Sequence, residues 1–271
     1  MSNKYMPHTQ ADIEKMLKRI GVDTIDDLYS DVPQEVIFRE EYALPSAMSE
    51  IELRKHFEDL ANKTQRLTIF AGGGAYDHYS PSTVAHLLQR SEFYTAYTPY
   101  QPEISQGTLQ YIFEYQSMIS ELTGMEATNA SMYDGATATA EVVFMMVNSV
   151  RKKNRVLISD TISPRVLNVV KTYAKFHGVD ITVVPEKDGV SDLEAIRKEL
   201  EAGDVAGVVV PCPNKYGIVE DFTGFADAIH AAKAAMAINA DPSTLAVLRT
   251  PKEWGADIAC GDGQSLGMPL E

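Results

Sequence analysis

From residue 155 onward, short runs of apolar residues alternate with longer segments in which apolar residues recur every three or four positions. The short runs are rich in β-branched residues and predict strands, whereas the longer segments predict amphipathic helices. Such alternation is typical of βαβ units and of a parallel sheet that is buried on both faces. The predicted strands are 155–159, 180–184, 205–210, 236–239 and 257–260, and the predicted helices between them are 163–178, 191–200 and 222–235.

The first part of the chain has helical periodicity but no strands between its helices. Thr9 can cap a helix that ends at Gly21, a short helix follows Thr24, and Ser49 and Glu52 form a capping box that opens a third helix. Because these helices have no β partner, we expect residues 1–66 to be an N-terminal helical arm that packs on the main domain or on another subunit. Residues 67–271 are then the large α/β domain. Two further helices are predicted over 108–123, with Leu109, Ile112, Phe113, Ile119 and Leu122 on its inner side, and over 138–151.

The composition argues against two classes of partner. The 38 acidic and 24 basic residues leave a net charge of −14, which disfavours binding to nucleic acid and to an anionic membrane surface. We find no run of 18 apolar residues and no signal-peptide pattern, so we expect a cytoplasmic protein. Cys212 and Cys260 lie in no metal-ligand spacing, so we expect neither a metal site nor a disulfide framework.

Residues 94–107 combine a stiff backbone with many polar groups. Pro99 and Pro102 fix their own φ and push the preceding residues out of the helical region, which makes the segment an extended loop. Ser105 can cap the helix that follows and so anchor the loop. Such a loop suits a binding site, but tyrosines that pack on neighbouring elements would explain it as well. The candidate site residues are Tyr97, Thr98, Tyr100, Gln101, Glu103, Ser105 and Gln106.

Other polar segments also have two interpretations. Residues 134–137 stand at the start of a helix, where free amides and the helix dipole could hold an anion, although simple capping by Asp134 needs no ligand. Residues 211–214 and 241–242 follow predicted strands, where ligands of parallel sheets bind, but each could be an ordinary turn. The three glycines 72–74 permit a tight turn or the close approach of a ligand.

Taken together, several motifs closely resemble one family, the glycine cleavage system P-protein, or glycine dehydrogenase (decarboxylating). The resemblance extends from about Tyr5 to the last residue, and its last two motifs match the family's alpha subunit, called subunit 1. The motifs are Tyr97–Gly107, Leu122-Thr123-Gly124, Asn129-Ala130-Ser131, Asp134-Gly135, Thr137-Ala138, Glu141, Trp254–Ile258 and Gly263–Pro269.

The resemblance implies a fold, a reaction and partners. The fold would be the large domain of fold type I of the pyridoxal phosphate enzymes, which resembles that of aspartate aminotransferase. In the reaction, an alpha/beta assembly would decarboxylate glycine with pyridoxal phosphate and pass the aminomethyl group to the lipoyl arm of the H-protein. In the family, subunit 1 continues into a small C-terminal domain. Because this sequence stops in a Gly/Pro-rich stretch after the last predicted strand, we expect a truncation that removes that domain.

The resemblance also implies where a cofactor would sit. Fold type I enzymes hold pyridoxal phosphate as a Schiff base on a lysine. Alignment on Pro269 places Gln264 at that position, and no lysine follows Lys252. We therefore expect no covalent cofactor on this chain and place pyridoxal phosphate in the beta subunit. The positions that the resemblance assigns to a cofactor, which we expect to be vestigial, are Asp134, Gly135, Ala136 and Thr137 for the phosphate, Asn214 for the ring hydroxyl and Asp241 for the pyridine nitrogen.

Three hypotheses of function follow. In the first, the chain is noncatalytic alone and completes the partner's active site in trans through residues 97–107, which would bind glycine. In the second, it is only a scaffold for the beta subunit. In the third, it is an autonomous pyridoxal phosphate enzyme that uses Lys215 or Lys233, which we disfavour because neither follows the strand that the fold would require.

Overall fold

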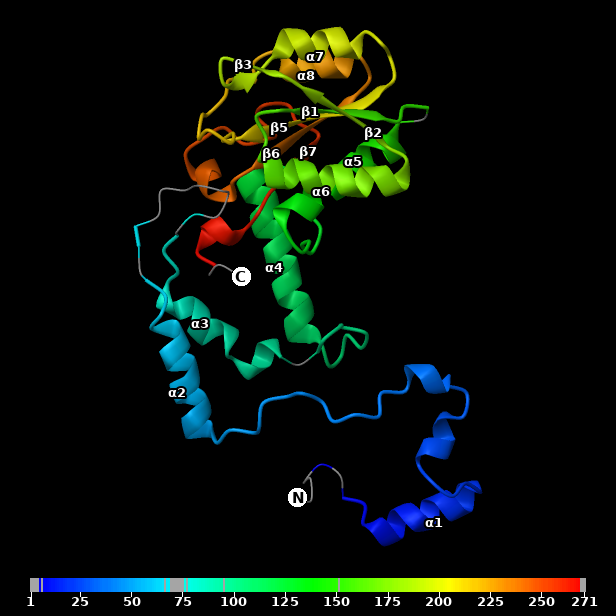
Figure 1. The fold of residues 1–271 in the computed structure, drawn as a ribbon. Helices are drawn as coiled ribbons and strands as arrows, with labels where there is room; N and C mark the ends of the chain where they lie inside the picture. The colour runs from blue at the N-terminus through cyan, green and yellow to red at the C-terminus, as the bar shows by residue number, and fades with distance from the viewer. Residues whose placement is uncertain are drawn as a thin grey trace. The chain divides into compact units, whose positions relative to one another are not determined.

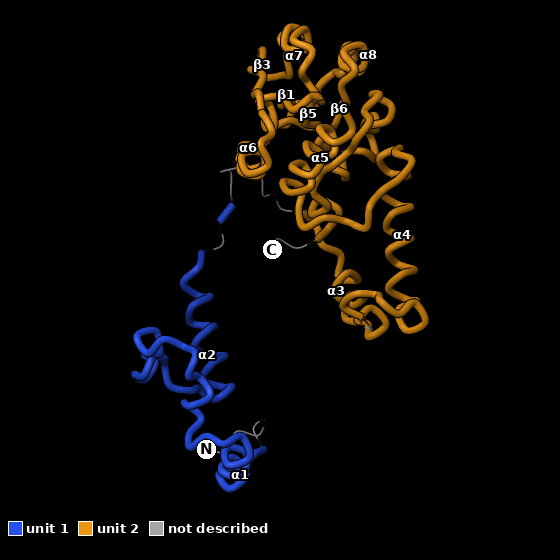
Figure 2. Tube along the Cα trace, turned by 90° about the vertical axis from the view of Figure 1, so that its right-hand side faces the viewer, with its two compact units in different colours: residues 1–68 blue, residues 69–271 orange. Residues whose placement is uncertain are grey.

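The computed structural model describes residues 5, 7–65, 67–68, 76, 78–94, 96–150 and 152–268. The glycines 72–74 and the alignment anchor Pro269 lie outside these described residues. The chain divides into two compact units, residues 1–68 and residues 69–271 (Figure 2).

Unit 1 contains two capped helices. Helix α1 (Gln10–Ile20) begins after Thr9, whose hydroxyl accepts the Asp12 N–H while the Asp12 carboxylate accepts the Thr9 N–H. Helix α2 (Glu50–Ala61) has the same reciprocal arrangement at Ser49. Both caps predicted from the sequence are confirmed, because a short polar side chain before each helix satisfies backbone donors that have no partner within the helix.

The rest of unit 1 is irregular. The short helix expected after Thr24 is a 3-10 turn (Asp26–Tyr29), and a second such turn follows at Gln34–Val36. None of the residues described in this unit has a buried side chain. The described residues of this unit therefore form no hydrophobic core of their own.

Unit 2 is built on a parallel sheet. The strands lie in the order β2-β1-β5-β6-β7, and each neighbouring pair is parallel. All five predicted strands are present, and β5 is buried along its whole length, as expected for a central strand covered on both faces. The strands are β1 (Arg155–Ser159), β2 (Asp180–Val184), β5 (Val205–Cys212), β6 (Ala235–Ala240) and β7 (Ile258–Cys260).

Helices cover both faces of this sheet (Figure 1). Successive strand residues point to opposite faces, so Leu157 packs with α7 (Leu193–Leu200) and α8 (Phe225–Ala231). Its neighbours Val156 and Ile158 pack instead with α5 (Gly135–Ser149) and α6 (Pro164–His177). The two apolar layers are the core that the sequence pattern predicts.

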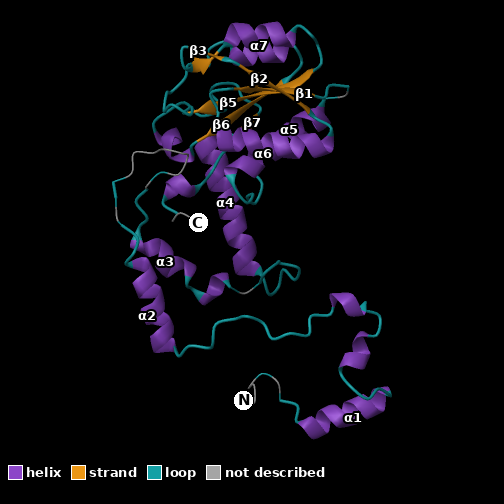
Figure 3. Cartoon of the chain, in the orientation of Figure 1, coloured by secondary structure: helices purple, strands orange, loops and turns teal. Residues whose placement is uncertain are grey.

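The described part of unit 2 also contains two further helices and a hairpin (Figure 3). Helix α4 precedes α5 in the chain, and a small antiparallel hairpin lies between β2 and α7. The hairpin was not predicted, because strands of two residues leave no periodicity to detect. These elements are α3 (Ser82–Leu88), α4 (Gln106–Thr123) and the hairpin strands β3 (Glu186–Lys187) and β4 (Val190–Ser191), and the short 3-10 turns are Ser91–Phe93, Pro242–Ala246 and Gln264–Leu266. Among the described residues, no helix combines the length and apolarity needed to cross a membrane.

Several helix starts differ from the sequence-based expectations, among them those of α5 at Gly135 rather than 138 and of α8 at Phe225 rather than 222. Helix α4 begins at Gln106 rather than at 108, and Ser105 occupies its N-cap position without a capping bond from its side chain. Helix α7 is capped by Asp192, which accepts the N–H groups of Glu194 and Ala195. The expected cap Ser191 instead ends β4, because tertiary contacts take its hydroxyl.

One helix end and one helix face also differ from expectation. Helix α8 ends at Ala231 and not at 235, and Lys233 lies in the turn before β6 with a left-handed backbone, φ +55°. On α4, Phe113 was expected on the inner side but is 67% exposed. The other apolar residues expected there are only partly buried. Periodicity marks an apolar face, but it does not say whether the same chain covers that face.

Candidate functional site: the carboxyl ends of β6 and β7

The start of α5 is occupied by carboxylates. Asp134 accepts the Thr137 N–H at 2.6 Å and the Thr137 hydroxyl at 2.8 Å. The hydrogen bond from the Thr137 amide is the main cause that lowers the pKa of Asp134, so this carboxyl stays ionised. The Gly135 N–H donates to Oδ2 of Asp262 at 3.2 Å. Of the two interpretations of residues 134–137, capping by Asp134 is therefore the one present.

Asp241 lies at the end of β6 and is held by two serines. Its Oδ1 atom accepts the Ser243 N–H at 3.0 Å, the Ser243 hydroxyl at 2.8 Å and the hydroxyl of Ser265. The first two bonds form the turn that the sequence allowed at residues 241–242. The third joins the carboxyl end of β6 to the segment after β7.

Gln264 belongs to that same segment. Its N–H donates to Oδ1 of Asp262 at 2.9 Å, and its side-chain amide donates to the Met268 carbonyl at 3.1 Å. The amide nitrogen of Gln264 is therefore part of a local turn. An amide nitrogen is also not a nucleophile, so it cannot take the place of an amine.

Glycines let the segment after β7 approach its neighbours closely. A Cβ atom at Gly135 would lie 2.9 Å from the Asp262 nitrogen and from the Gly261 carbonyl carbon. At Gly261 it would lie 1.9 Å from the Ala240 carbonyl oxygen. Both positions therefore require a residue without a side chain.

A hydrogen-bonded network of side chains lies behind this contact. Asn239 on β6 donates to the Thr139 hydroxyl at 2.8 Å, and that hydroxyl donates to the Gly135 carbonyl at 2.7 Å. Cys260 lies 3.5 Å from the same hydroxyl, and burial raises the pKa of its thiol. The thiol of Cys260 is therefore a neutral member of this network rather than a reactive thiolate.

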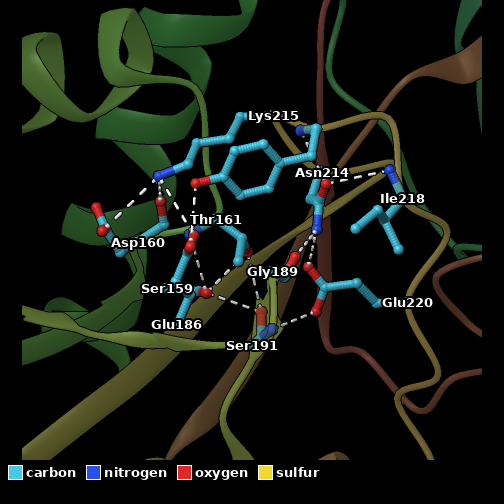
Figure 4. Close-up of polar contacts among 11 residues, drawn as sticks. Ser159, Asp160, Thr161, Glu186, Gly189, Ser191, Asn214, Lys215, Ile218 and Glu220 are labelled. Atoms are coloured by element: carbon cyan, nitrogen blue, oxygen red, sulfur yellow. Dashed lines mark hydrogen bonds and ion pairs between the residues drawn. The ribbon is translucent and has the colours of Figure 1, made fainter.

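Asn214 lies in a different polar cluster (Figure 4). Its amide nitrogen donates to the Gly189 carbonyl and to the Glu220 carboxylate, each at 2.8 Å. Its oxygen accepts the N–H groups of Tyr216 and Ile218 at 2.9 and 3.1 Å. With both donor hydrogens used and two bonds accepted, the buried side chain has no group left for a ligand.

Lys215, in the same cluster, is a cation whose charge is balanced by nearby carboxylates. Its Nζ donates to the Asp160 carbonyl at 2.6 Å and lies 3.7 and 3.5 Å from the carboxylates of Asp160 and Glu186. Burial alone would lower the pKa of Lys215, but the charge of Asp160 and the contacts with Tyr216 and Glu186 outweigh it and raise the pKa. A lysine that stays protonated is a poor nucleophile.

A closed ring of three hydroxyls completes the cluster. The side chains of Ser159, Thr161 and Ser191 lie within 2.7 to 3.1 Å of one another, and all three are buried (Figure 4). Each hydroxyl can donate one bond and accept another, so the ring satisfies itself. It ties the β3–β4 hairpin to the end of β1 and leaves no group directed at a ligand.

The loop before α4 is open to solvent. Tyr97 is fully exposed and Tyr100 is 87% exposed, and the side chains of Thr98, Gln101 and Glu103 are exposed as well. The structure records no hydrogen bond from any of these side chains to a described residue. The loop is nevertheless anchored, because the Ser105 N–H donates to the Gln101 carbonyl at 3.0 Å and Ser105 itself is buried.

One buried group at the base of this loop lacks a partner. The hydroxyl of Thr108, in the first turn of α4, is buried and has no hydrogen-bond partner among the described residues. Buried polar atoms without a hydrogen-bond partner are uncommon in folded proteins.

Solved structures of low sequence identity show the class of fold. Mouse CSAD matches with a TM-score of 0.61 at 13% identity, over 92% of this chain and 56% of its own. The cysteine desulfurase CsdA of Escherichia coli matches with a TM-score of 0.53 at 12% identity, over 70% of this chain and 49% of its own. The parallel sheet with helices on both faces is that of fold type I, the aspartate-aminotransferase-like fold of pyridoxal phosphate enzymes, as predicted.

Closer relatives show the family. A family model described as "Glycine cleavage system P-protein" matches residues 3–271, and the chain belongs to this family. "Probable glycine dehydrogenase (decarboxylating) subunit 1" of Moorella thermoacetica is 50% identical over 266 residues, which are 98% of this chain and 60% of that protein. The protein of the same name from Geobacillus sp. is 47% identical over 274 residues, which are 100% of this chain and 61% of the relative.

A solved structure belongs to the same group. The crystal structure of glycine decarboxylase (P-protein) of the glycine cleavage system, in inhibitor-bound form, matches with a TM-score of 0.85 at 41% identity. The match covers 99% of this chain and 60% of that chain. The chain thus spans about 60% of the length of these relatives, and the resemblance inferred from the sequence is confirmed.

The residues of this chain do not fit pyridoxal phosphate. A phosphate at the start of α5 would meet amides that already donate to Asp134 and Asp262, and it would meet two like charges. Asn214 has no bond left for a ring hydroxyl, and Gln264 cannot form an imine. The structure also brings Asp262 and Ser265 into this region, which the sequence reasoning missed. Their position directly after the last strand was the available signal.

Proposed function

We propose that this chain is the noncatalytic subunit of a two-subunit glycine decarboxylase. A second subunit would hold pyridoxal phosphate, decarboxylate glycine and pass the aminomethyl group to the lipoyl arm of an H-protein. The observation that carries the proposal is Gln264, an amide at the aligned position of the Schiff-base lysine, with its nitrogen bonded to the Met268 carbonyl. The name "subunit 1" of the relatives supports a partner subunit. A cytoplasmic location belongs to the same proposal and agrees with two free cysteines.

The part that this chain plays in the reaction is assigned to residues 97–107. Tyr97, Tyr100 and Gln101 offer hydrogen bonds to a small carboxylate, and Glu103 offers a negative charge to an ammonium group. These side chains are exposed and form no hydrogen bond to a described residue, and their backbone is held at Ser105, so binding would cost little rearrangement. The loop would therefore help to bind and orient glycine in an active site whose cofactor belongs to the partner.

Two alternatives differ in what they require of the chain. A pure scaffold would tolerate polar-to-apolar changes in the loop. An autonomous pyridoxal phosphate enzyme would need a reactive lysine at the carboxyl ends of the strands. Lys215 is held as a cation between Asp160 and Glu186, and Lys233 lies at the amino end of β6, the opposite edge of the sheet. Neither lysine suits that chemistry.

Reconstitution tests the proposal. The full chain is co-purified with a beta subunit, and glycine–bicarbonate exchange is measured with and without it, and then with Tyr100→Phe and Glu103→Gln. We expect exchange to require this chain and to fall about tenfold or more in each variant, because a hydrogen bond to a charged group contributes about 1.5–3 kcal/mol. Tyr173→Phe, on the outer helix α6, is the matched control and should leave exchange unchanged.

The readouts separate the hypotheses. Size-exclusion chromatography must show the same complex for every variant, so that a lost rate is not lost assembly. Normal exchange in both loop variants would leave only the hypothesis that this chain is a scaffold for the beta subunit. Exchange by this chain alone with added pyridoxal phosphate would refute the noncatalytic assignment altogether.

A further inference from the structure

The segment after β7 fills both polar ends of the vestigial cofactor region. Asp262 reaches the start of α5, and three residues later Ser265 reaches Asp241 at the end of β6. In the family's cofactor-binding arrangement, the first place would hold a phosphate and the second a ring nitrogen. Here one short stretch of this chain, residues 262–265, occupies both.

We infer that Asp262 is an internal replacement for the phosphate, so that the anion seat of this subunit is filled by its own side chain. The seat is the start of α5, where the amides and the helix dipole favour a negative group. The ligand that Asp262 excludes is inorganic phosphate or a phosphate monoester. The inference deepens the proposed function and rests on it only for the identity of the excluded cofactor.

Both oxygens of Asp262 are in use, which fixes the side chain. Oδ2 accepts the Gly135 N–H at 3.2 Å, and Oδ1 accepts the Gln264 N–H at 2.9 Å. The carboxylate therefore joins α5 to the turn at Gln264–Leu266. A side chain that merely neutralised the helix dipole would not need this second bond.

The backbone around Asp262 is shaped for that contact. Gly135 and Gly261 leave no space for a Cβ atom, so the carboxylate reaches the helix from a segment packed directly on its first turn. A phosphate group would need the space that the Asp262 carboxylate fills next to the Gly135 N–H. Exclusion thus has a steric part as well as an electrostatic part.

Asp134 strengthens the electrostatic part. Its carboxylate takes the Thr137 amide, so two negative side chains meet at one helix end. A dianionic phosphate would be repelled by both of them. Removing Asp262 deletes one charge and frees the Gly135 amide, while the cap at Asp134 stays in place.

The experiment measures thermal unfolding of the full chain against inorganic phosphate, with potassium chloride at equal ionic strength as the salt control. For Asp262→Ala we expect a melting temperature about 2–4 °C lower in chloride, and a recovery that grows with phosphate concentration. The unsubstituted chain should show no rise specific to phosphate. Asp192→Ala, which removes the cap of α7, is the matched control and should lose stability without recovery in phosphate.

Each outcome decides the inference. A phosphate response in the unsubstituted chain would show that Asp262 does not block the seat. No response in Asp262→Ala would show that the seat does not take phosphate, and an equal response in Asp192→Ala would show that any uncapped helix start suffices. If Asp262→Ala does not fold, Asp262→Ser, which also removes the carboxylate from the Gly135 amide, must show the response. The readout is binding, so a failure here is distinct from a failure in the exchange assay.

Discussion

Single carboxylates decide what the start of α5 can bind. Asp134 and Asp262 each accept a backbone N–H of the first turn, so the helix end that could attract an anion is already neutralised by the chain itself. Both acids lie in glycine-containing stretches, Asp134-Gly135 and Gly261-Asp262-Gly263, where the backbone can turn tightly. By the inference above, one side chain, that of Asp262, decides whether the start of α5 is open to an anionic ligand or already filled.

The cap at Asp134 predicts a pH dependence. Its pKa is lowered in the folded chain, so its ionised form stabilises the fold above the pKa it has when unfolded, and that contribution is lost as the pH falls through the lower, folded pKa. Asp134→Asn keeps a capping oxygen but does not titrate. We expect the stability difference between the two proteins to be constant near neutral pH and to shrink below about pH 4. Urea unfolding across this pH range measures it, and a difference that does not change with pH would contradict the prediction.

At the scale of elements, the sheet is held by the close approach of α5 to the central strand β5. A Cβ atom at Gly207 would lie 2.2 Å from the sulfur of Met146 and 3.0 Å from the Ala235 carbonyl oxygen. Met146 is completely buried, so its side chain has little freedom to move aside. The glycine thus sets the distance between a helix and the middle of the sheet.

Gly207→Ala tests that contact. We expect it to lower the free energy of unfolding by about 1–3 kcal/mol, because the added methyl group overpacks the core. Met146→Ala removes the main obstruction. The double variant should therefore lose less free energy of unfolding than the two single variants lose together. Urea denaturation of the two single variants and the double variant gives the coupling. Strict additivity would show that the methyl group is accommodated in another way.

At the scale of the whole molecule, the two units differ in what stabilises them. Unit 2 has two apolar layers around a parallel sheet, whereas none of the described residues of unit 1 is buried. The helices of unit 1 are 11 and 12 residues long, near the limit below which an isolated helix is marginal in water. Their capping boxes contribute locally but do not replace a core.

A peptide of residues 1–68 should therefore fold poorly by itself. We expect circular dichroism to show low helix content and a gradual loss of signal on heating, because only helix propensity and capping stabilise it. Added trifluoroethanol should raise the helix content, since the helix signals are present in the sequence. A sharp cooperative transition in plain buffer would contradict this and would indicate a core within the arm.

Much of the fold was predictable because its signals are local. The strands at 155–159 and 180–184 and the helix α6 were found with their bounds or close to them, since β-branched runs and periodic segments depend only on nearby residues. The exposure of Phe113 and the early end of α8 were not predicted. A sequence pattern identifies an apolar face, but it does not show which part of the structure packs on that face. The resemblance places Asn214 in a vestigial cofactor site, but only the structure gives its bonds, which go to Gly189, Glu220 and two backbone amides.

The sequence by itself determined the family, the parallel α/β architecture and the capped helices of residues 1–68. It also showed that position 264 is a glutamine and not a lysine. These follow from residue identity and short-range spacing, which a linear chain displays directly. Only the tertiary structure decided that Asp262 meets Gly135, 127 positions away, and that Ser265 meets Asp241. Such contacts depend on how the strands are ordered in the sheet, because that order decides which strand ends become neighbours.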